Sequence, residues 1–267
     1  MNIEFINERN AFDNYGHFTH DNLVHLFCML KEQNLLNSKN ILYLNPKLYK
    51  WNFVLQHLDI NIKYEKCNNP DIILNNPLNI FRKYELDKRP SFNWSFKYIE
   101  KILEKNISLE INNACKVFLR TENYKDDIAD YYTKKLKINI NKNSKNVLII
   151  HRDPLKDRRC IINDTEFYNQ IKNYFDNIGY KVHIVNFSEM SFEEQITYIN
   201  KCSIIIGYFG AGFSNTLYSK NNPYVIEILP NNWTYVSHYQ WSNTENFKIM
   251  NIRKENSICT DRIKRIY

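Results

Sequence analysis

The chain has 267 residues, 43% of them hydrophobic and 24% charged, which suits one or two globular domains and excludes intrinsic disorder as the main state. Only 5 Gly and 7 Pro exclude collagen-like and linker-dominated chains. The net charge of +7 is spread along the chain, so it fits a nucleotide or phosphate ligand better than duplex nucleic acid.

The 6 cysteines are dispersed and form neither a CxxC motif nor a Cys/His cluster of zinc spacing. We therefore expect reduced thiols and no metal site. The first residues lack a basic segment followed by an apolar one, and no apolar run is long enough to span a membrane. These features predict a cytoplasmic protein without stable membrane insertion.

The first half of the chain predicts alternating helices and strands. Apolar residues at helical spacing predict a helix over 21–33. The further expected elements are strands at 40–44 and 71–74, a helix at 96–105 and a strand at 116–120. No internal repeat is visible.

The second half alternates more clearly, after an Asn- and Lys-rich stretch at 139–145 that is typical of a linker. Strands are expected at 146–151, 181–186, 203–207 and 224–229, helices at 166–178 and 191–201, and a turn into a helix at 210–218. Gly179 is expected to end the first of these helices. Ser191 and Glu194 are spaced as a capping box that begins the second.

Strands that alternate with helices at this spacing indicate parallel sheets with crossover helices. Because the linker separates two similar halves, we expect an α/β fold of two Rossmann-like lobes with a central cleft. The first lobe is assigned to residues 1–140 and the second to 146–250. Residues 251–267 are expected to form a tail or a closing helix.

A glycine-rich stretch, IIIGYFGAGFSN over 204–215, stands between a predicted strand and a predicted helix. It holds three of the 5 glycines of the chain. Glycines here allow close backbone approach, and free amides at a helix N-terminus favour a phosphate. The candidate phosphate ligands are Gly210, Ala211, Gly212, Ser214 and Asn215. An ordinary tight turn with small residues for packing explains the same pattern, and the two interpretations stay open.

A basic stretch follows the strand predicted at 146–151. It reads HRDPLKDRRCIIN over 151–163 and gathers Arg152, Lys156, Arg158 and Arg159 before a helix. Guanidinium groups match phosphate oxygens in a bidentate way, so this loop is a second candidate phosphate site. The alternative is a solvated basic loop without a ligand.

Together these stretches resemble glycosyltransferase family 61, a group that includes plant β-xylosyltransferases and protein O-linked GlcNAc transferases. The family pattern is an Arg-rich loop ending in Asn, a Glu-Gln-Ile helix, a strand into Gly-x-His-Gly-Ala-Gly-Leu-Thr-Asn, and a strand ending Val-Ile-Glu-Ile. The resemblance covers roughly 147–230. The matching residues are Arg152, Arg159, Asn163, Gln195, Ile196, Gly207, Gly210, Ala211, Gly212, Asn215 and Glu227.

The N-terminal stretch NYGHFTHDNL over 14–23 is similar to the opening Asn-x-x-His-Phe-x-x-Asp of the same family. His17 and Asp21 are four residues apart and share one face of a helix. A carboxylate beside an imidazole can take the proton of an acceptor hydroxyl, so these two are the catalytic candidates. The alternative is a helix N-terminus that His17 and Asp21 merely cap.

The resemblance implies a GT-B architecture and an inverting, metal-independent glycosyltransferase without a cofactor. The donor is a nucleotide sugar, favoured as a UDP-sugar, and the acceptor is a hydroxyl on a glycan or a protein. The resemblance places the donor phosphates at Arg152, Arg158, Arg159, Asn163 and the 210–215 turn. Glu227 is expected at a strand end facing the cleft, where it contacts ribose; the alternative is a surface glutamate.

One residue departs from the family pattern. Phe209 stands where the family has a histidine before Gly-Ala-Gly, and a phenyl ring cannot donate to phosphate or share a proton. The backbone amides of the turn do not depend on that side chain. A catalytically silent nucleotide-sugar-binding protein of the same fold is therefore the alternative function, and a basic nucleic-acid-associated protein is a third hypothesis.

Overall fold

The computed structural model describes residues 1–7, 15–83, 108–109, 111, 113–114, 116, 124–141, 144–153, 164–229 and 247–251. The chain divides into two compact units, Met1–Ile128 and Ala129–Tyr267. The boundary lies within helix α7 (Lys125–Lys135), earlier in the chain than the linker at 139–145 used for the sequence-based division.

The first unit contains a parallel sheet of four strands in the order β3-β2-β1-β4. The strands are β1 (Asn2–Ile6), β2 (Ile41–Tyr43), β3 (Asn61–Lys63) and β4 (Ile72–Asn75). The strands predicted at 40–44 and 71–74 are confirmed as β2 and β4. β1 and β3 were not predicted; β3 reads NIK and has a single apolar residue.

The helix predicted over 21–33 is part of a longer helical run that begins at Tyr15. This run consists of α1 (Tyr15–Phe18), the π-helical turn η2 (Thr19–Leu23) and α2 (Val24–Glu32). Every residue of α2 from Val24 to Leu30 is buried. The other helices described in this unit are η3 (Pro46–Trp51), α3 (Asn52–Leu55) and α4 (Pro77–Lys83).

Two further expectations concern the end of this unit. The helix predicted at 96–105 lies outside the described residues. The strand predicted at 116–120 is wrong at Lys116, which has helical backbone, and residues 117–120 lie outside the described part.

The second unit contains a parallel sheet of five strands in the order β6-β5-β7-β8-β9. The strands are β5 (Asn146–His151), β6 (Lys181–Asn186), β7 (Ile204–Tyr208), β8 (Tyr224–Leu229) and β9 (Phe247–Asn251). The first four confirm the predicted strands, and β9 was not predicted. In this register Gly207 of β7 lies between Ile150 of β5 and Glu227 of β8.

The helices described in the second unit are the C-terminal part of α7, α8 (Asp164–Asn177), η5 (Phe187–Glu189), α9 (Phe192–Lys201) and η6 (Ala211–Tyr218). α8 and α9 confirm the helices predicted at 166–178 and 191–201, whereas α7 and η5 were not predicted. Ser191 and Glu194 form the predicted capping box of α9. Gly179 adopts a φ of +80° just after α8, as predicted. η6 differs from expectation because it is a 3₁₀ helix, and most of it is buried.

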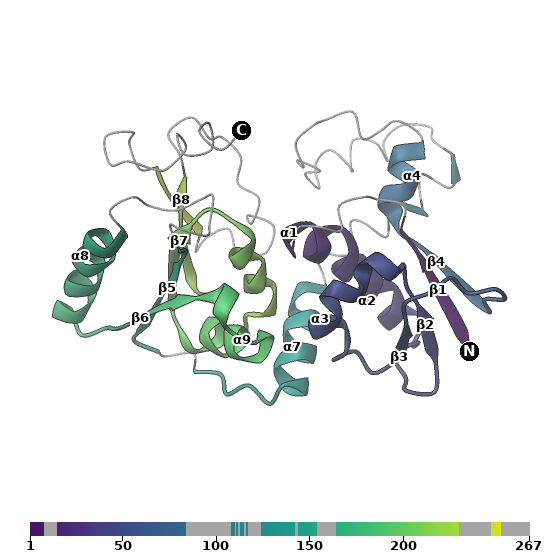
Figure 1. The fold of residues 1–267 in the computed structure, drawn as a ribbon, viewed down its shortest axis with the longest axis horizontal. Coiled ribbons are helices and arrows are strands. Elements are labelled where there is room, and N and C mark those ends of the chain that lie inside the picture. The colour runs from purple at the N-terminus through teal and green to yellow at the C-terminus, as the bar shows by residue number, and fades with distance from the viewer. Residues whose placement is uncertain are drawn as a thin grey trace. The chain divides into compact units, whose positions relative to one another are not determined.

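Helices cover both faces of this second sheet, with α8 on one face and α9 on the other (Figure 1). Val147 and Ile149 pack with Tyr168 of α8, whereas Leu148 and Ile150 pack with Ile199 of α9 and with Phe213. A strand buried on both faces has a continuous apolar run instead of an alternating one. This explains why β5 reads VLII at its centre.

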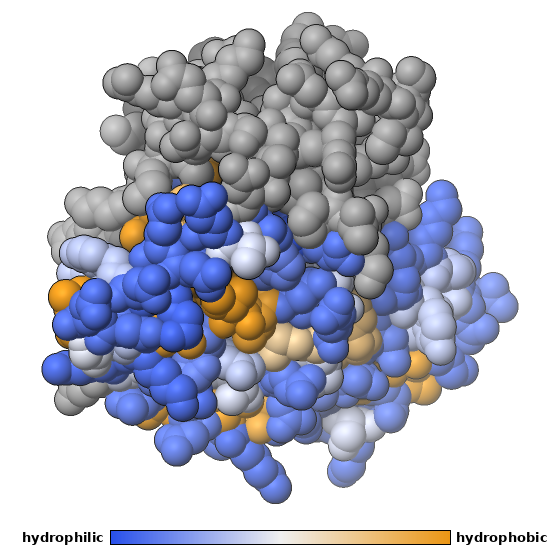
Figure 2. All heavy atoms as spheres, turned by 60° about the vertical axis from the view of Figure 1, so that its left-hand side comes forward, coloured by the Kyte–Doolittle hydropathy of each residue, from blue (hydrophilic) through white to orange (hydrophobic). Residues whose placement is uncertain are grey.

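The surface of the described residues is largely hydrophilic on the face drawn in Figure 2, where apolar side chains form small separate patches. No described helix has the length and apolarity needed to cross a membrane. Among the described residues, no group of three or more His, Cys, Asp and Glu side chains is arranged to hold a metal ion. Cys28, Cys67 and Cys202 are buried thiols, and burial raises the pKa of Cys202 to about 12.

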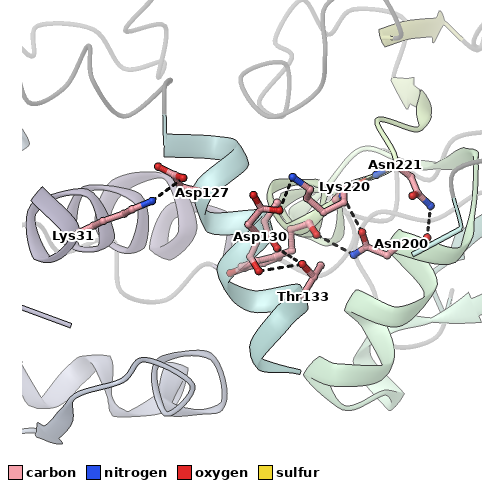
Figure 3. A network of polar contacts seen from close by, with 10 residues as sticks. Lys31, Asp127, Asp130, Thr133, Asn200, Lys220 and Asn221 are labelled. Carbon is pink, nitrogen blue, oxygen red and sulfur yellow. Dashed lines mark hydrogen bonds and ion pairs between the residues drawn. The ribbon is translucent and has the colours of Figure 1, made fainter. Parts of the chain in front are cut away.

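Asn200 joins α9, the end of η6 and the loop that follows (Figure 3). Its side chain is 0% exposed. Its Nδ2 donates to the carbonyl oxygens of Ile196 (3.0 Å) and Tyr218 (2.9 Å), and its Oδ1 accepts from the amide of Lys220 (2.8 Å). The neighbouring Lys220 forms an ion pair with Asp130 of α7 at 2.5 Å.

We predict that Asn200→Leu lowers the free energy of unfolding by about 3 kcal/mol, because it leaves a buried carbonyl and a buried amide without partners. Chemical denaturation of the full chain measures this. Asn173→Leu, the same change on an exposed position of α8, is the matched control and should change stability by less than about 0.5 kcal/mol. Equal effects of the two changes would contradict the structural role of Asn200.

Candidate functional site

The strand order of the second unit locates a candidate binding edge. The chain runs from β5 outward to β6 and then returns to the other side of β5 with β7, so the direction of winding reverses between β5 and β7. Ligands of open parallel sheets bind outside the carboxyl ends of the strands at such a reversal. Here the residues that follow those ends are Arg152 and Asp153 after β5, and Phe209 and Gly210 after β7.

Arg152 lies directly against Gly210 at this edge. A β-carbon added at Gly210 would lie 1.8 Å from Nη2 and 2.6 Å from Cζ of Arg152. The guanidinium group therefore occupies the space that any larger residue at position 210 would need. The two stretches that the sequence singled out, the basic loop and the glycine-rich turn, meet at this contact.

The surroundings of Gly207 and Gly212, the other two glycines of this stretch, differ from those of Gly210. At Gly207 a β-carbon would lie 3.1 Å from the carbonyl oxygen of Ile150 and 3.2 Å from a ring carbon of Phe213, so this glycine serves close packing. At Gly212 the nearest atom, on Phe187, would be 3.4 Å away, which is an ordinary contact. Close packing therefore accounts for Gly207, and at Gly210 the Arg152 side chain takes the space of a β-carbon. Phosphate binding by this turn stays a prediction.

The amides at the start of η6 are the groups to which the sequence assigned phosphate binding, and this role stays a prediction. The first N–H groups of a helix have no partner inside the helix. Gly210 caps η6 without a side-chain hydrogen bond, and the first backbone bond of the turn runs from the amide of Phe213 to the carbonyl of Gly210 (3.1 Å). Ala211 and Gly212 precede it and are half-buried.

Ser214 and Asn215 are both 0% exposed. Asn215 donates from Nδ2 to Oε1 of Gln195 at 2.7 Å, and Gln195 donates from Nε2 to the carbonyls of Phe187 (2.8 Å) and Met190 (3.0 Å). This chain of bonds ties η6 to the start of α9. The sequence analysis matched Gln195 to the family pattern but gave it no role. A direct phosphate contact by Ser214 or Asn215 stays a prediction.

Glu227 is 0% exposed and lies within β8, beside Gly207 in the sheet register. The alternative of a surface glutamate is therefore wrong, and the expected place at an open strand end is wrong as well. Burial raises the pKa of the Glu227 carboxyl to about 8, and a hydrogen bond from the backbone amide of Gly210 opposes this shift only in part. The same turn residue thus lies against Arg152 and donates to Glu227.

Three of the predicted donor ligands, Arg158, Arg159 and Asn163, lie outside the described residues. His151, at the end of β5, was not proposed as a site residue. Its Nδ1 lies 3.5 Å from Oδ2 of Asp164, and its ring packs edge-on against Tyr168 with the centroids 5.5 Å apart.

The first unit has a comparable edge, because its strand order reverses between β1 and β4. Asn76 follows β4, and its amide donates to the carbonyl of Ile6 at the end of β1 (3.1 Å). The Nδ2 of Asn76 donates to the backbone carbonyl of Asp21 at 2.5 Å. Asn76, which the sequence analysis missed, thereby fixes the turn that contains Asp21 at the carboxyl edge of the sheet.

Asp21 lies in η2 and is 4% exposed. The capping alternative is wrong for Asp21, because the helical run begins at Tyr15 and Asp21 stands inside it. His17 belongs to α1, and its side chain lies outside the described part of the structure. The predicted pairing of His17 with Asp21 therefore stays a prediction.

We predict a specific pH dependence for Glu227. Because its pKa is raised from 4.5 to about 8, the folded protein keeps a proton that the unfolded chain has released between these values. The stability of the wild type therefore falls as the pH rises through this window. Glu227→Gln is neutral at every pH and keeps an acceptor for the Gly210 amide, so it lacks this loss.

Thermal or chemical unfolding at a series of pH values measures the difference. The advantage of Glu227→Gln over the wild type should be absent below about pH 4.5, grow with rising pH to a few kcal/mol, and stay constant above about pH 8. Glu189→Gln, on the exposed turn η5, is the control and should not produce this growing difference. Parallel profiles of wild type and Glu227→Gln would show that folding does not shift the pKa of this carboxyl.

Comparison with known proteins adds independent findings. The family model of glycosyltransferase 61 matches residues 15–226. No protein among those with curated descriptions matches the sequence. Among solved structures, the Escherichia coli heptosyltransferase WaaC with ADP-2-deoxy-2-fluoro heptose has a TM-score of 0.51 and 9% identity, over 100% of this chain and 98% of that chain. A family 9 glycosyl transferase from Veillonella parvula has a TM-score of 0.44 and 8% identity, over 94% of this chain and 85% of that chain.

The heptosyltransferase match shows similarity of fold alone, and with the two parallel α/β units it confirms the predicted GT-B-like fold class. The family match covers most of the chain and includes Asp21, Arg152 and the glycine-rich turn. The sequence resemblance to this family is thereby confirmed. The chain belongs to glycosyltransferase family 61 and is a glycosyltransferase.

Proposed function

We propose that this glycosyltransferase moves a sugar from a nucleoside-diphosphate donor, favoured as a UDP-sugar, to a hydroxyl on a glycan or a protein. The transfer inverts the anomeric centre and uses neither a metal ion nor a cofactor. The proposed donor site rests on the contact between the Arg152 guanidinium and Gly210, at the place where the strand order of the second sheet reverses. The choice of UDP, the inversion and the independence of metal rest on the family resemblance.

The donor diphosphate binds at this edge in the proposal. A guanidinium group and the first amides of η6 converge there, and both favour phosphate oxygens. Without a metal ion, the charge that develops on the leaving diphosphate is stabilised by such preorganised donors. Arg158, Arg159 and Asn163, which the sequence places in the same loop, are proposed to complete the site.

Glu227 supports this arrangement electrostatically. With a pKa of about 8, its carboxyl is mainly neutral at pH 7 and does not repel a diphosphate. As an acceptor for the amide of Gly210 it also holds the turn that faces the ligand. The ribose contact expected for Glu227 requires this buried side chain to become accessible when the donor binds.

Asp21 is the proposed general base. Its carboxylate takes the proton of the acceptor hydroxyl while the hydroxyl oxygen forms a bond to the anomeric carbon of the donor sugar. The bond from that carbon to the diphosphate oxygen breaks on the opposite side, and the nucleoside diphosphate leaves with the electron pair. His17, four residues before Asp21, is the proposed partner of the carboxylate.

Phe209 supports the second candidate, a catalytically silent nucleotide-sugar-binding protein. Its amide donates to the carbonyl of Ile228 at 3.0 Å, and its side chain is 5% exposed. Position 209 is therefore part of the packed sheet edge, and its ring cannot replace a histidine in proton transfer. Donor binding without turnover would favour this candidate.

The first prediction on function compares two glycines of the same turn. Gly210→Ala should weaken binding of UDP at least tenfold, because the new methyl group overlaps the Arg152 guanidinium and displaces it. Gly212→Ala is the matched control and should retain the affinity of the wild type, because its methyl group makes only ordinary contacts. Isothermal titration of UDP into each protein measures both.

The same titrations include EDTA, which should leave UDP binding unchanged. CMP and GDP are measured beside UDP to identify the donor nucleotide. Equal affinities of the Gly210→Ala variant and the wild type for the bound nucleotide would place its phosphates away from Arg152.

The second prediction separates catalysis from binding. Asp21→Asn should lower the rate of UDP release from UDP-sugars in the presence of acceptor saccharides by 10²-fold or more, because it removes the general base. It should leave the dissociation constant of UDP unchanged, since Asp21 lies in the other unit. A wild type that binds UDP but shows no turnover with any donor and acceptor would establish the silent alternative.

A further inference from the structure

Asn22, the neighbour of Asp21, is a buried polar residue whose side chain has no hydrogen-bond partner among the described residues. Its side chain is 1% exposed, and within the part of the chain that the structure describes neither Nδ2 nor Oδ1 has a hydrogen-bond partner. Buried side-chain amides are nearly always paired, because an unpaired donor or acceptor costs folding free energy. Folding stability alone therefore does not explain why a side-chain amide with two unpaired atoms stands at this position.

The backbone around Asn22 is unusual as well. Asn22 belongs to the π-helical turn η2 between α1 and α2. Such turns are rare and occur frequently at functional sites, where they change the direction of side chains in an otherwise regular helix. The turn is held at the carboxyl edge of the first sheet by the bond from Asn76 to the carbonyl of Asp21.

Two other asparagines at this edge, Asn76 and Asn79, use their side chains to hold the structure together. Asn76 bonds to Asp21 and accepts from the amide of Leu78 at 3.0 Å. Asn79 donates to the carbonyl of Ile6 and to Oδ1 of Asn75, both at 3.0 Å. Asn22 differs from Asn76 and Asn79, because neither polar atom of its side chain has a partner among the described residues. It also lies next to Asp21, the proposed base.

A group of aromatic side chains lies on the same helical run and the helix packed beside it. Tyr15 of α1 packs against Trp51 and Phe53, with ring centroids 5.5 and 6.0 Å apart. Phe53 is 38% exposed, and Tyr15 and Trp51 are half-buried. Partly exposed rings offer apolar faces to amphipathic ligands, and the apolar faces of sugar rings can stack on them.

We propose that Asn22 binds a saccharide acceptor through both atoms of its side-chain amide and so positions the reactive hydroxyl beside Asp21. A pair of neighbouring sugar hydroxyls accepts one hydrogen bond from Nδ2 and donates another to Oδ1, which satisfies both atoms. A single serine or threonine hydroxyl cannot bond to both atoms with good hydrogen-bond angles, because Nδ2 and Oδ1 diverge from the same carbon. This inference rests on the proposed function and names its acceptor class as a glycan.

The test compares four forms of the full chain: wild type, Asn22→Leu, Asn22→Ala and Asn76→Leu. Thermal unfolding measures stability. Saturation-transfer NMR with methyl glycosides of glucose, galactose, mannose and xylose measures acceptor binding, and a Ser/Thr-rich peptide serves as the competing acceptor class. Titration with UDP measures donor binding, which does not involve Asn22.

We expect Asn22→Leu to unfold at the same or a higher temperature than the wild type, because it replaces an unpaired buried amide by an apolar group of similar size. Its affinity for the glycoside that the wild type binds should fall at least tenfold, while its affinity for UDP is unchanged. Asn76→Leu should unfold at a lower temperature. Asn22→Ala should show the same loss of glycoside binding. Because alanine is smaller than asparagine, this variant excludes steric blocking of the site as the cause.

Three results would overturn the inference: a loss of thermal stability in Asn22→Leu as large as in Asn76→Leu, glycoside binding that does not depend on Asn22, or a wild type that binds only the peptide. Failure of the proposed function has a different signature. In that case the wild type binds no nucleotide, whereas a glycoside whose binding depends on Asn22 still supports the saccharide site.

Discussion

The close approach of β5 and β7 is the contact on which the proposed donor site depends. Gly207 lies so near Ile150 that a β-carbon at position 207 would come within 3.2 Å of it, so only glycine fits without displacement. Because the two strands are parallel and adjacent, their carboxyl ends emerge together. The chain then places Arg152 after one strand and Gly210 after the other, and a β-carbon at 210 would overlap the guanidinium group, which would have to move.

The charge distribution at the carboxyl edge of the second sheet favours an anionic ligand. Arg152 keeps its charge at all relevant pH values, whereas burial favours the neutral form of Glu227 at pH 7. An ionised carboxylate in the same place would oppose a diphosphate. The turn itself is held in place by hydrogen bonds, since Asn215 and Gln195 join η6 to the start of α9. Such fixed dipoles need little reorganisation when charge develops during transfer.

In the first unit, the carboxyl edge of the parallel sheet holds the turn that carries the proposed base. There Asn76 bonds to both Ile6 and Asp21, and so joins the sheet to the helical run that carries the proposed base. The π turn contains Asn22, whose buried side-chain amide has no partner within the described part of the chain, and an unpaired buried amide costs folding free energy. Proteins retain such unfavourable features mainly where function requires them, which gives the acceptor proposal its physical basis.

The sequence by itself determined the family, the α/β class and most elements of the second unit, because these depend on local signals. The capping box at Ser191, the glycine after α8 and the apolar runs of β5 and β8 each act over a few residues. Only the tertiary structure decided which residues meet. The contact of Arg152 with Gly210 and the burial of Glu227 join segments far apart in the chain, and no local pattern encodes such distances. The π turn at Asp21 and Asn22 was equally hidden, since its apolar spacing resembles that of an ordinary helix.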